Sequence, residues 1–156
     1  MPGAVKMEKT LILVKPDAIQ RGLAGEVITR LEKRGLKIVG MKLIHMDATL
    51  AETHYAIHEG KPFFQPLVDY ITSSPIIAAV FEGPGAVEVA RNTIGATSPL
   101  EAGMGTIRGD LGLEIGRNLV HGSDSLENAE TEIGLFFSPD EVISWDRDLD
   151  RWIIEF

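Results

Sequence analysis

The order of the predicted secondary-structure elements indicates an α+β sandwich of the βαββαβ kind, an antiparallel sheet with helices packed on one face. Apolar and β-branched runs typical of strands alternate along the chain with segments of helical periodicity. The chain has 156 residues, of which 44% are hydrophobic, so it can bury a core but is too short for two ordinary domains. We therefore expect one domain over residues 1–156. A small doubly wound sheet fits the same alternation of elements.

The first three elements follow from local patterns. Residues 10–14 are β-branched and aliphatic and end at Lys15, which predicts a buried strand that delivers a lysine to its C-terminal edge. Residues 26–34 have a helical repeat and stop at Gly35, a favourable residue after a helix C-terminus. Residues 36–44 predict a strand with a bulge, or with both faces partly covered, because the apolar parity shifts within the run.

The middle of the chain predicts two helices, a strand and a third helix. Thr49-Leu50-Ala51-Glu52 has the pattern of a capping box that opens a helix through His58. A second helix is expected over residues 63–73, and the unbroken apolar run 76–81 predicts a central strand. Residues 85–92 predict another helix, which carries Arg91 near its end.

His54 and His58 lie four residues apart, a spacing that suits zinc on one helix face. The metalloprotease pattern requires Glu directly after the first histidine, and Tyr55 stands there instead. A structural or site-lining role is therefore favoured over metal binding for both histidines.

The segment 95–118 has little periodicity and six glycines, so we expect a long functional loop. It leads through a last short strand into His121, which precedes a turn that opens a helix capped by Asp124 or Ser125, with Glu127 completing a capping box. Backbone N–H groups at such a helix N-terminus bind phosphate, and an imidazole can accept a phosphoryl group. The alternative is a buried histidine ahead of an ordinary capped helix.

The C-terminal region contains one more helix start and an apolar end. Ser138-Pro139-Asp140-Glu141 predicts a capping box with proline at the first helical position. Trp152, Ile153, Ile154 and Phe156 form an apolar cluster at a terminus, which must be covered by the protein's own sheet or by another subunit.

Composition excludes several classes of protein. The N-terminal residues lack the apolar centre of a signal peptide and no run is long enough to span a bilayer, so we expect a soluble, cytoplasmic protein without membrane partners. The absence of cysteine excludes disulfides. A net charge of −8 disfavours nucleic acid as the main partner, and any phosphate site must concentrate positive charge locally, for which Lys15, Arg91 and Arg108 are candidates.

Seven blocks, in order, resemble the nucleoside diphosphate kinase family. They are Val14-Lys15-Pro16-Asp17 with Gln20-Arg21-Gly22, His54-Tyr55, Lys61-Pro62-Phe63-Phe64, Glu82-Gly83, Gly95-Ala96-Thr97, Gly105 to Asp110, and Arg117-Asn118 running into His121-Gly122-Ser123-Asp124-Ser125. The resemblance implies a ferredoxin-like fold and transfer of the γ-phosphate of a nucleoside triphosphate, mainly ATP, to a nucleoside diphosphate. The rival hypothesis is a regulatory or scaffolding protein with the same fold and no turnover.

The resemblance also implies roles for individual residues. His121 would be the phosphorylated nucleophile, oriented by Glu132, with Ser123 and Tyr55 as further members of the site. The residues expected to contact the phosphates and ribose are Lys15, Arg91, Thr97, Arg108 and Asn118, and those expected to contact the base are Phe63 and Ile115.

Cofactor and assembly are implied in the same way. The sequence has neither a P-loop nor a Rossmann glycine motif, and it offers no carboxylate cage, which suits Mg²⁺ carried by the nucleotide rather than held by protein ligands. In the resembled family the C-terminal segment packs near neighbouring subunits, and hexamers generally retain such an extension. We therefore expect a homo-hexamer, with a homo-tetramer as the alternative.

Overall fold

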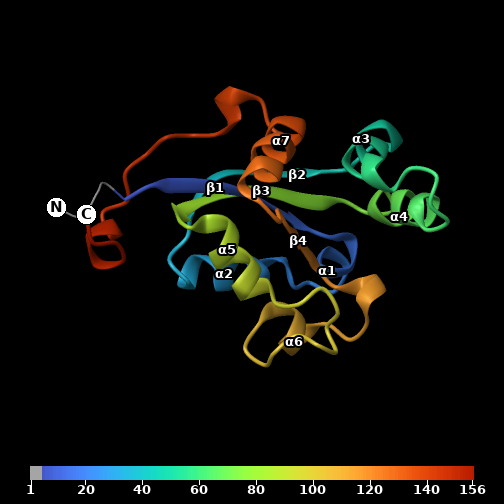
Figure 1. Cartoon of the computed structure of the whole chain (residues 1–156), viewed down its shortest axis with the longest axis horizontal. Helices are drawn as coiled ribbons and strands as arrows, with labels where there is room; N and C mark the ends of the chain where they lie inside the picture. The colour runs from blue at the N-terminus through green and yellow to red at the C-terminus, as the bar shows by residue number, and fades with distance from the viewer. Residues whose placement is uncertain (1–4) are drawn as a thin grey trace.

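In the computed structural model, which describes residues 5–156, four antiparallel strands form one sheet in the order β2-β3-β1-β4 (Figure 1). The strands are β1 (Met7–Val14), β2 (Lys37–Ile44), β3 (Ile76–Pro84) and β4 (Val120–Gly122). This order confirms the predicted antiparallel α+β sandwich, and the doubly wound alternative, which requires parallel strands, is wrong. The run around residues 76–81 is a central strand, as predicted.

Seven helices and four short 3₁₀ turns connect and cover the strands of the described chain. They are α1 (Pro16–Gln20), α2 (Ala24–Lys33), α3 (Ala48–His54), η1 (Ala56–His58), α4 (Phe64–Ile71), α5 (Ala86–Ile94), α6 (Ile107–Leu111), η2 (Ile115–Arg117), α7 (Leu126–Phe136), η3 (Pro139–Glu141) and η4 (Asp150–Trp152). None of these helices is long and apolar enough to cross a membrane.

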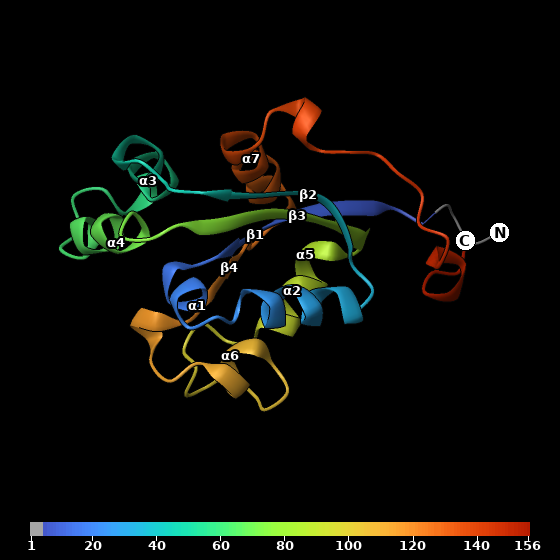
Figure 2. The same cartoon turned by 180° about the vertical axis from the view of Figure 1, so that it is seen from behind.

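Both faces of the sheet are covered, whereas the sequence predicted helices on one face only. α2 and α5 lie on one face and α7 on the other, with α3 and α4 at one end of the sheet (Figures 1 and 2). Successive residues of a strand point to opposite faces. In β1, Ile12 and Val14 therefore enter the core beneath α2 and α5, while Leu11 and Leu13 enter the core beneath α7. A strand that is apolar at every position needs cover on both sides.

The predicted irregularity in the second strand is confirmed. The pairing of β2 with β3 shifts register between Ile38 and Gly40, which is the signature of a bulge. β2 is also an edge strand, because in the sheet it pairs only with β3; the segment after α7 contacts it through the Ile143 N–H, which donates to the Val39 carbonyl at 2.8 Å.

The cap of α3 differs from the sequence prediction, whereas Ser125, one of the two caps predicted for α7, is confirmed. Asp47, and not Thr49, caps α3, because its carboxylate accepts a hydrogen bond from the Leu50 N–H at 2.8 Å. This helix ends at His54, and His58 belongs to the following 3₁₀ turn. Ser125 caps α7, which makes Asn128 the third helical residue, so the box with Glu127 does not form.

The predicted capping box near the C-terminus is present. Ser138 and Glu141 make the reciprocal bonds expected around Pro139.

Segment 95–118, predicted to be a loop, contains α6 and η2. Thr106 caps α6 by accepting from the Gly109 N–H at 3.0 Å. Only glycine fits at position 109, because an added Cβ would lie 2.0 Å from the carbonyl oxygen of Gly103. A helix of five residues that includes a glycine has no usable periodicity, which is why the sequence did not reveal it.

Candidate active site

His121 lies in β4, opposite Leu13 of β1, and its imidazole is paired with a carboxylate. The Nε2 atom lies 2.5 Å from Oε2 of Glu132 on α7, and the two side chains are 31% and 17% exposed. An ionised carboxylate can only accept, so in the neutral imidazole Nε2 carries the proton and Nδ1 keeps its lone pair. His121 therefore has one fixed nitrogen and one nitrogen available as a nucleophile.

The contact that α7 makes with His121 comes from Glu132 in its second half and not from its first turn, and a phosphate site at the helix N-terminus stays a prediction. After His121 the chain continues along β1, where the Ser123 N–H donates to the Leu11 carbonyl at 3.1 Å. The helix then starts beyond the sheet pairing and runs back, which brings Glu132, rather than the N-terminal turn, to the imidazole.

Lys15 and Asn118 meet at the end of β1. The Lys15 ammonium donates to the Asn118 side-chain oxygen at 2.6 Å, and the Asn118 amide donates to the Thr97 carbonyl at 3.0 Å. Burial lowers the pKa of Lys15 to about 8; Asp17 opposes this shift, whereas Arg108 and Arg117 add to it. The structure thus brings three predicted site residues into one hydrogen-bonded chain.

Arg108 and Arg91 form hydrogen bonds to backbone carbonyls in and next to β4, the strand that carries His121. The buried guanidinium of Arg108 donates to the carbonyls of Asn118 at 3.1 Å and Val120 at 2.6 Å. Arg91 donates to the Gly122 carbonyl at 3.2 Å. Burial, followed by repulsion from Arg91, lowers the pKa of Arg108 to about 10.

These cations form a local positive site in an acidic chain. We call Lys15, Arg91, Arg108 and Arg117 the basic cluster; its members influence one another electrostatically. Because the net charge of the chain is −8, the cluster supplies the local positive potential that an anionic ligand requires.

The aromatic ring of His54 lies next to His121, and that of Tyr55 lies next to His54. The His54 ring stands edge-on to the His121 ring, with centroids 5.0 Å apart, and Tyr55 lies 4.7 Å from His54. Burial, with additional repulsion from His121 and Lys15, lowers the pKa of His54 to about 3, so this ring is neutral at physiological pH. Within residues 5–156 no group of three or more histidine, aspartate or glutamate side chains could hold a metal ion.

The remaining predicted residues lie in two kinds of environment. Phe63 and Ile115 are 47% and 60% exposed, so both present apolar surface to solvent. Ser123 is fully buried, and its hydroxyl accepts from the Leu11 N–H at 3.2 Å. Its contacts in the structure are thus to the β1 backbone.

Asp17 and Tyr70 belong to the site, although no role was predicted for either residue. The Tyr70 hydroxyl donates to the Asp17 carboxylate, which also accepts from the Leu119 N–H at 3.0 Å. Burial, together with this bond to Asp17, raises the pKa of Tyr70. The sequence signal for Asp17 was its place in the block Val14-Lys15-Pro16-Asp17, whereas Tyr70 lies 53 residues away and lies in none of the blocks.

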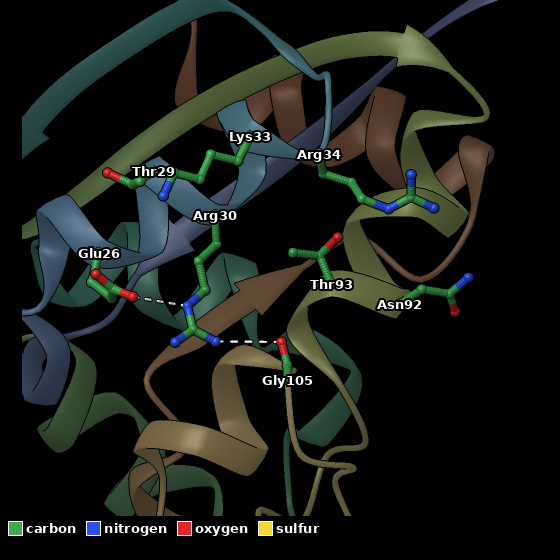
Figure 3. Close-up of a pocket in the computed structure, with 8 residues that line it drawn as sticks. All are labelled: Glu26, Thr29, Arg30, Lys33, Arg34, Asn92, Thr93 and Gly105. Carbon is green, nitrogen blue, oxygen red and sulfur yellow. Dashed lines mark hydrogen bonds and ion pairs between the residues drawn. The ribbon is translucent and has the colours of Figure 1, made fainter. Parts of the chain in front are cut away.

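A cleft of about 550 Å³ between α2 and α5 is separate from this site, since none of the predicted site residues lines it. Arg30 spans one end of the cleft, as Figure 3 shows, bonding Glu26 at 2.9 Å and the Gly105 carbonyl at 3.3 Å. Arg30 also pairs with Asp110 at 2.6 Å. It therefore ties the segment around α6, which carries Arg108, to α2.

The fold and the site define a ferredoxin-like α+β protein whose histidine–glutamate pair stands beside a basic cluster. The family model described as nucleoside diphosphate kinase matches residues 8–142, and the chain belongs to this family.

The chain is similar to nucleoside diphosphate kinases of other organisms over nearly its full length. A nucleoside diphosphate kinase of Thermomicrobium roseum is 59% identical, covering 95% of this chain and 99% of its own. One from Archaeoglobus fulgidus is 58% identical, with 96% and 99% covered. The solved structure of a halophilic nucleoside diphosphate kinase from Halobacterium salinarum in complex with CDP has a TM-score of 0.93 at 51% identity, covering 96% of this chain and 100% of that one.

Proposed function

We propose that this chain is an active nucleoside diphosphate kinase that transfers the γ-phosphate of a nucleoside triphosphate, mainly ATP, to a nucleoside diphosphate through a phosphohistidine at His121. The observation that carries the proposal is the His121–Glu132 pair, which leaves Nδ1 free beside the basic cluster. The reaction maintains nucleoside triphosphate pools, and we place the protein in the cytoplasm, where these pools are used.

The first half-reaction forms a phosphorus–nitrogen bond. The neutral Nδ1 of His121 attacks the γ-phosphorus in line, the bond to the bridging oxygen breaks, and the nucleoside diphosphate leaves with that electron pair. The Nε2–H of His121 keeps its proton and donates to the Glu132 carboxylate, which stabilises the positive charge that develops on the ring. A second nucleoside diphosphate takes the phosphoryl group by the reverse path, which gives ping-pong kinetics.

The nucleotide is held by side chains rather than by a glycine loop. Arg91, Arg108 and Thr97 contact the phosphates, because the planar guanidinium binds oxygens in pairs and keeps its charge. Lys15 and Asn118, already joined at 2.6 Å, contact the ribose hydroxyl and a phosphate.

The base binds through its π-face. Phe63 stacks on one face of the base and Ile115 packs on the other. Both side chains are exposed to solvent, so a bound base could cover them. Tyr55 and Ser123 are further members of the site and lie at its periphery. The relative solved with CDP supports binding of a nucleoside diphosphate at such a site.

Mg²⁺ enters with the nucleotide. Glu132 is the carboxylate bonded to His121, and within residues 5–156 no group of three or more histidine, aspartate or glutamate side chains could hold a metal, which fits an ion held by the phosphates and water. Bound in this way, Mg²⁺ would neutralise charge on the phosphates. The protein contributes the cations of the basic cluster.

The protein assembles as a homo-hexamer, with a homo-tetramer as the alternative. In the single chain Ile154 is buried, but Trp152 and Phe156 remain 76% and 75% exposed. On the edge strand β2, Leu43 is 67% exposed. Exposed apolar side chains at a terminus and on an unpaired strand edge favour burial against other subunits.

The rival function, a silent scaffold, requires the loss of at least one reacting or phosphate-binding side chain. All the residues that distinguish the two are present and lie in one region, namely Lys15, Arg91, Arg108, Asn118 and His121.

The function is tested by presenting ATP and Mg²⁺ with GDP, CDP, UDP and a deoxynucleoside diphosphate in turn. Stacking reads a surface common to all bases, so every acceptor should be phosphorylated. His121→Ala should phosphorylate none. Turnover retained in His121→Ala, or confined to one base, would contradict the mechanism or the stacking model respectively.

A further inference from the structure

Leu119 has an unusual backbone conformation next to the site. Among the described residues it is the one other than glycine with a positive φ, 73°, and it is fully buried. The Val120 N–H donates to the Asn118 carbonyl at 2.8 Å across it, which makes a γ-turn of the rare, strained kind. Such a conformation persists only where the surrounding structure holds it.

Two side chains hold this turn: Arg108 donates to the carbonyls of Asn118 and Val120, and Asp17 is bonded to Leu119 itself. One carboxylate oxygen accepts from the Leu119 N–H at 3.0 Å, and the other accepts from the Tyr70 hydroxyl. The Leu119 carbonyl in turn accepts from the Lys15 N–H at 2.9 Å. Both polar groups of the strained residue are thus bonded to the segment 15–17, and α4 fixes the carboxylate through Tyr70.

The turn lies between two groups that the reaction needs. Asn118, which bonds Lys15, immediately precedes Leu119, and His121 follows two residues later in β4. A change in the backbone at Leu119 would therefore move the Asn118 amide and the imidazole relative to Lys15.

Asp17 also contributes charge at the same place. The charged and titratable groups that face Lys15 are Asp17, Arg108 and Arg117, together with the Tyr70 ring 5.4 Å from Nζ and His54. Of these, Asp17 is the group that favours the protonated lysine, whereas burial and the two arginines lower its pKa.

We propose that Asp17, with its carboxylate fixed by Tyr70, is a positioning residue for phosphoryl transfer, which holds the Leu119 turn and thereby aligns Asn118 and His121 with Lys15. The proposal rests on the proposed function, since it concerns the same site.

The test compares Asp17→Asn with Asp69→Asn. Asp69 is an exposed aspartate next to Tyr70 in sequence, so the two variants change the net charge equally. Phosphohistidine formation from labelled ATP should slow by about 100-fold in Asp17→Asn, the scale of a misplacement of about 1 Å, and stay at the wild-type rate in Asp69→Asn. The alkaline limb of kcat/KM should also move to lower pH in Asp17→Asn, because Lys15 loses the charge that raises its pKa. The proposal is overturned if Asp17→Asn forms phosphohistidine at the wild-type rate. It is also overturned if this variant is slow but the alkaline limb of its kcat/KM profile stays at the wild-type pH.

Tyr70→Phe separates position from charge. It removes the hydroxyl bond and leaves the carboxylate charge, so phosphohistidine should form more slowly while the alkaline limb stays in place. Melting curves of all variants are recorded together. If Asp17→Asn does not fold, Tyr70→Phe provides the test instead. A wild-type rate of phosphohistidine formation in Tyr70→Phe then overturns the proposal. Failure of the wild-type chain itself to form phosphohistidine would instead overturn the proposed function.

Discussion

At the residue scale, the site depends on pairs of side chains that constrain each other's protonation and direction. Glu132 fixes one nitrogen of His121, and Lys15 meets Asn118 at 2.6 Å. His121, Lys15 and Arg108 could be predicted from sequence because they lie in recognisable blocks, and Arg91 because it lies near the end of a predicted helix. The Asp17–Tyr70–Leu119 contacts could not, because these residues are far apart in the chain and no local pattern predicts their meeting.

Lys15 gives a prediction for the pH dependence of the reaction. Its pKa is lowered to about 8, so the side chain is charged below that pH and neutral above it. Because kcat/KM reports the free enzyme, this parameter should fall as the pH rises through about 8. The arginine in Lys15→Arg keeps its charge throughout this range, so its profile should lack the limb. An identical alkaline limb in both proteins would assign the titration to another group.

At the element scale, strands were easier to predict than the short helices that shape the site. β1 and β3 are apolar on both faces because helices cover both sides of the sheet, and such runs are visible in sequence. α6 is five residues long and is stabilised by contacts from elsewhere, notably the Arg30–Asp110 pair. Its existence depends on tertiary structure, which local propensity does not encode.

Two helical glycines should respond oppositely to alanine. In α6, a Cβ at Gly109 would collide with the Gly103 backbone, so Gly109→Ala should destabilise the protein by about 1–3 kcal/mol and reduce activity by displacing Arg108. In α7, a Cβ at Gly134 has nothing within 4 Å, so Gly134→Ala should stabilise it by up to about 1 kcal/mol. Denaturant unfolding and turnover of both variants check this. Equal effects of the two substitutions would contradict the close packing at Gly109.

At the scale of the whole molecule, an acidic protein binds an anionic substrate because its positive charge is concentrated at one place. The net charge is −8, yet four cations lie around the end of β1 and β4. The C-terminal segment is attached to the α2–β2 connection, where Arg147 donates to the Gly35 carbonyl at 2.8 Å. Its outermost aromatic side chains remain exposed in the single chain.

Deleting residues 151–156 tests the role of this segment. The deletion removes the buried Ile154, whose burial contributes about 1.5–3 kcal/mol, and the exposed Trp152 and Phe156. The melting temperature should fall by several degrees and smaller species should appear in light scattering. The substitution Glu155→Gln, at an exposed position, serves as the control. A deletion variant with unchanged mass and stability, or a full-length protein that is monomeric, would contradict the proposed assembly.

The most direct measurement of the central claim is covalent labelling of His121. The protein is incubated with γ-labelled ATP and Mg²⁺, separated from nucleotide, and treated with acid or alkali before the bound label is counted. We expect label on the wild-type chain that is lost in acid, survives alkali, and is released as nucleoside triphosphate when a nucleoside diphosphate is added. His121→Ala should take up none while remaining folded, and His58→Ala should be labelled normally. Label that resists acid, or that persists in His121→Ala, would contradict transfer through this histidine.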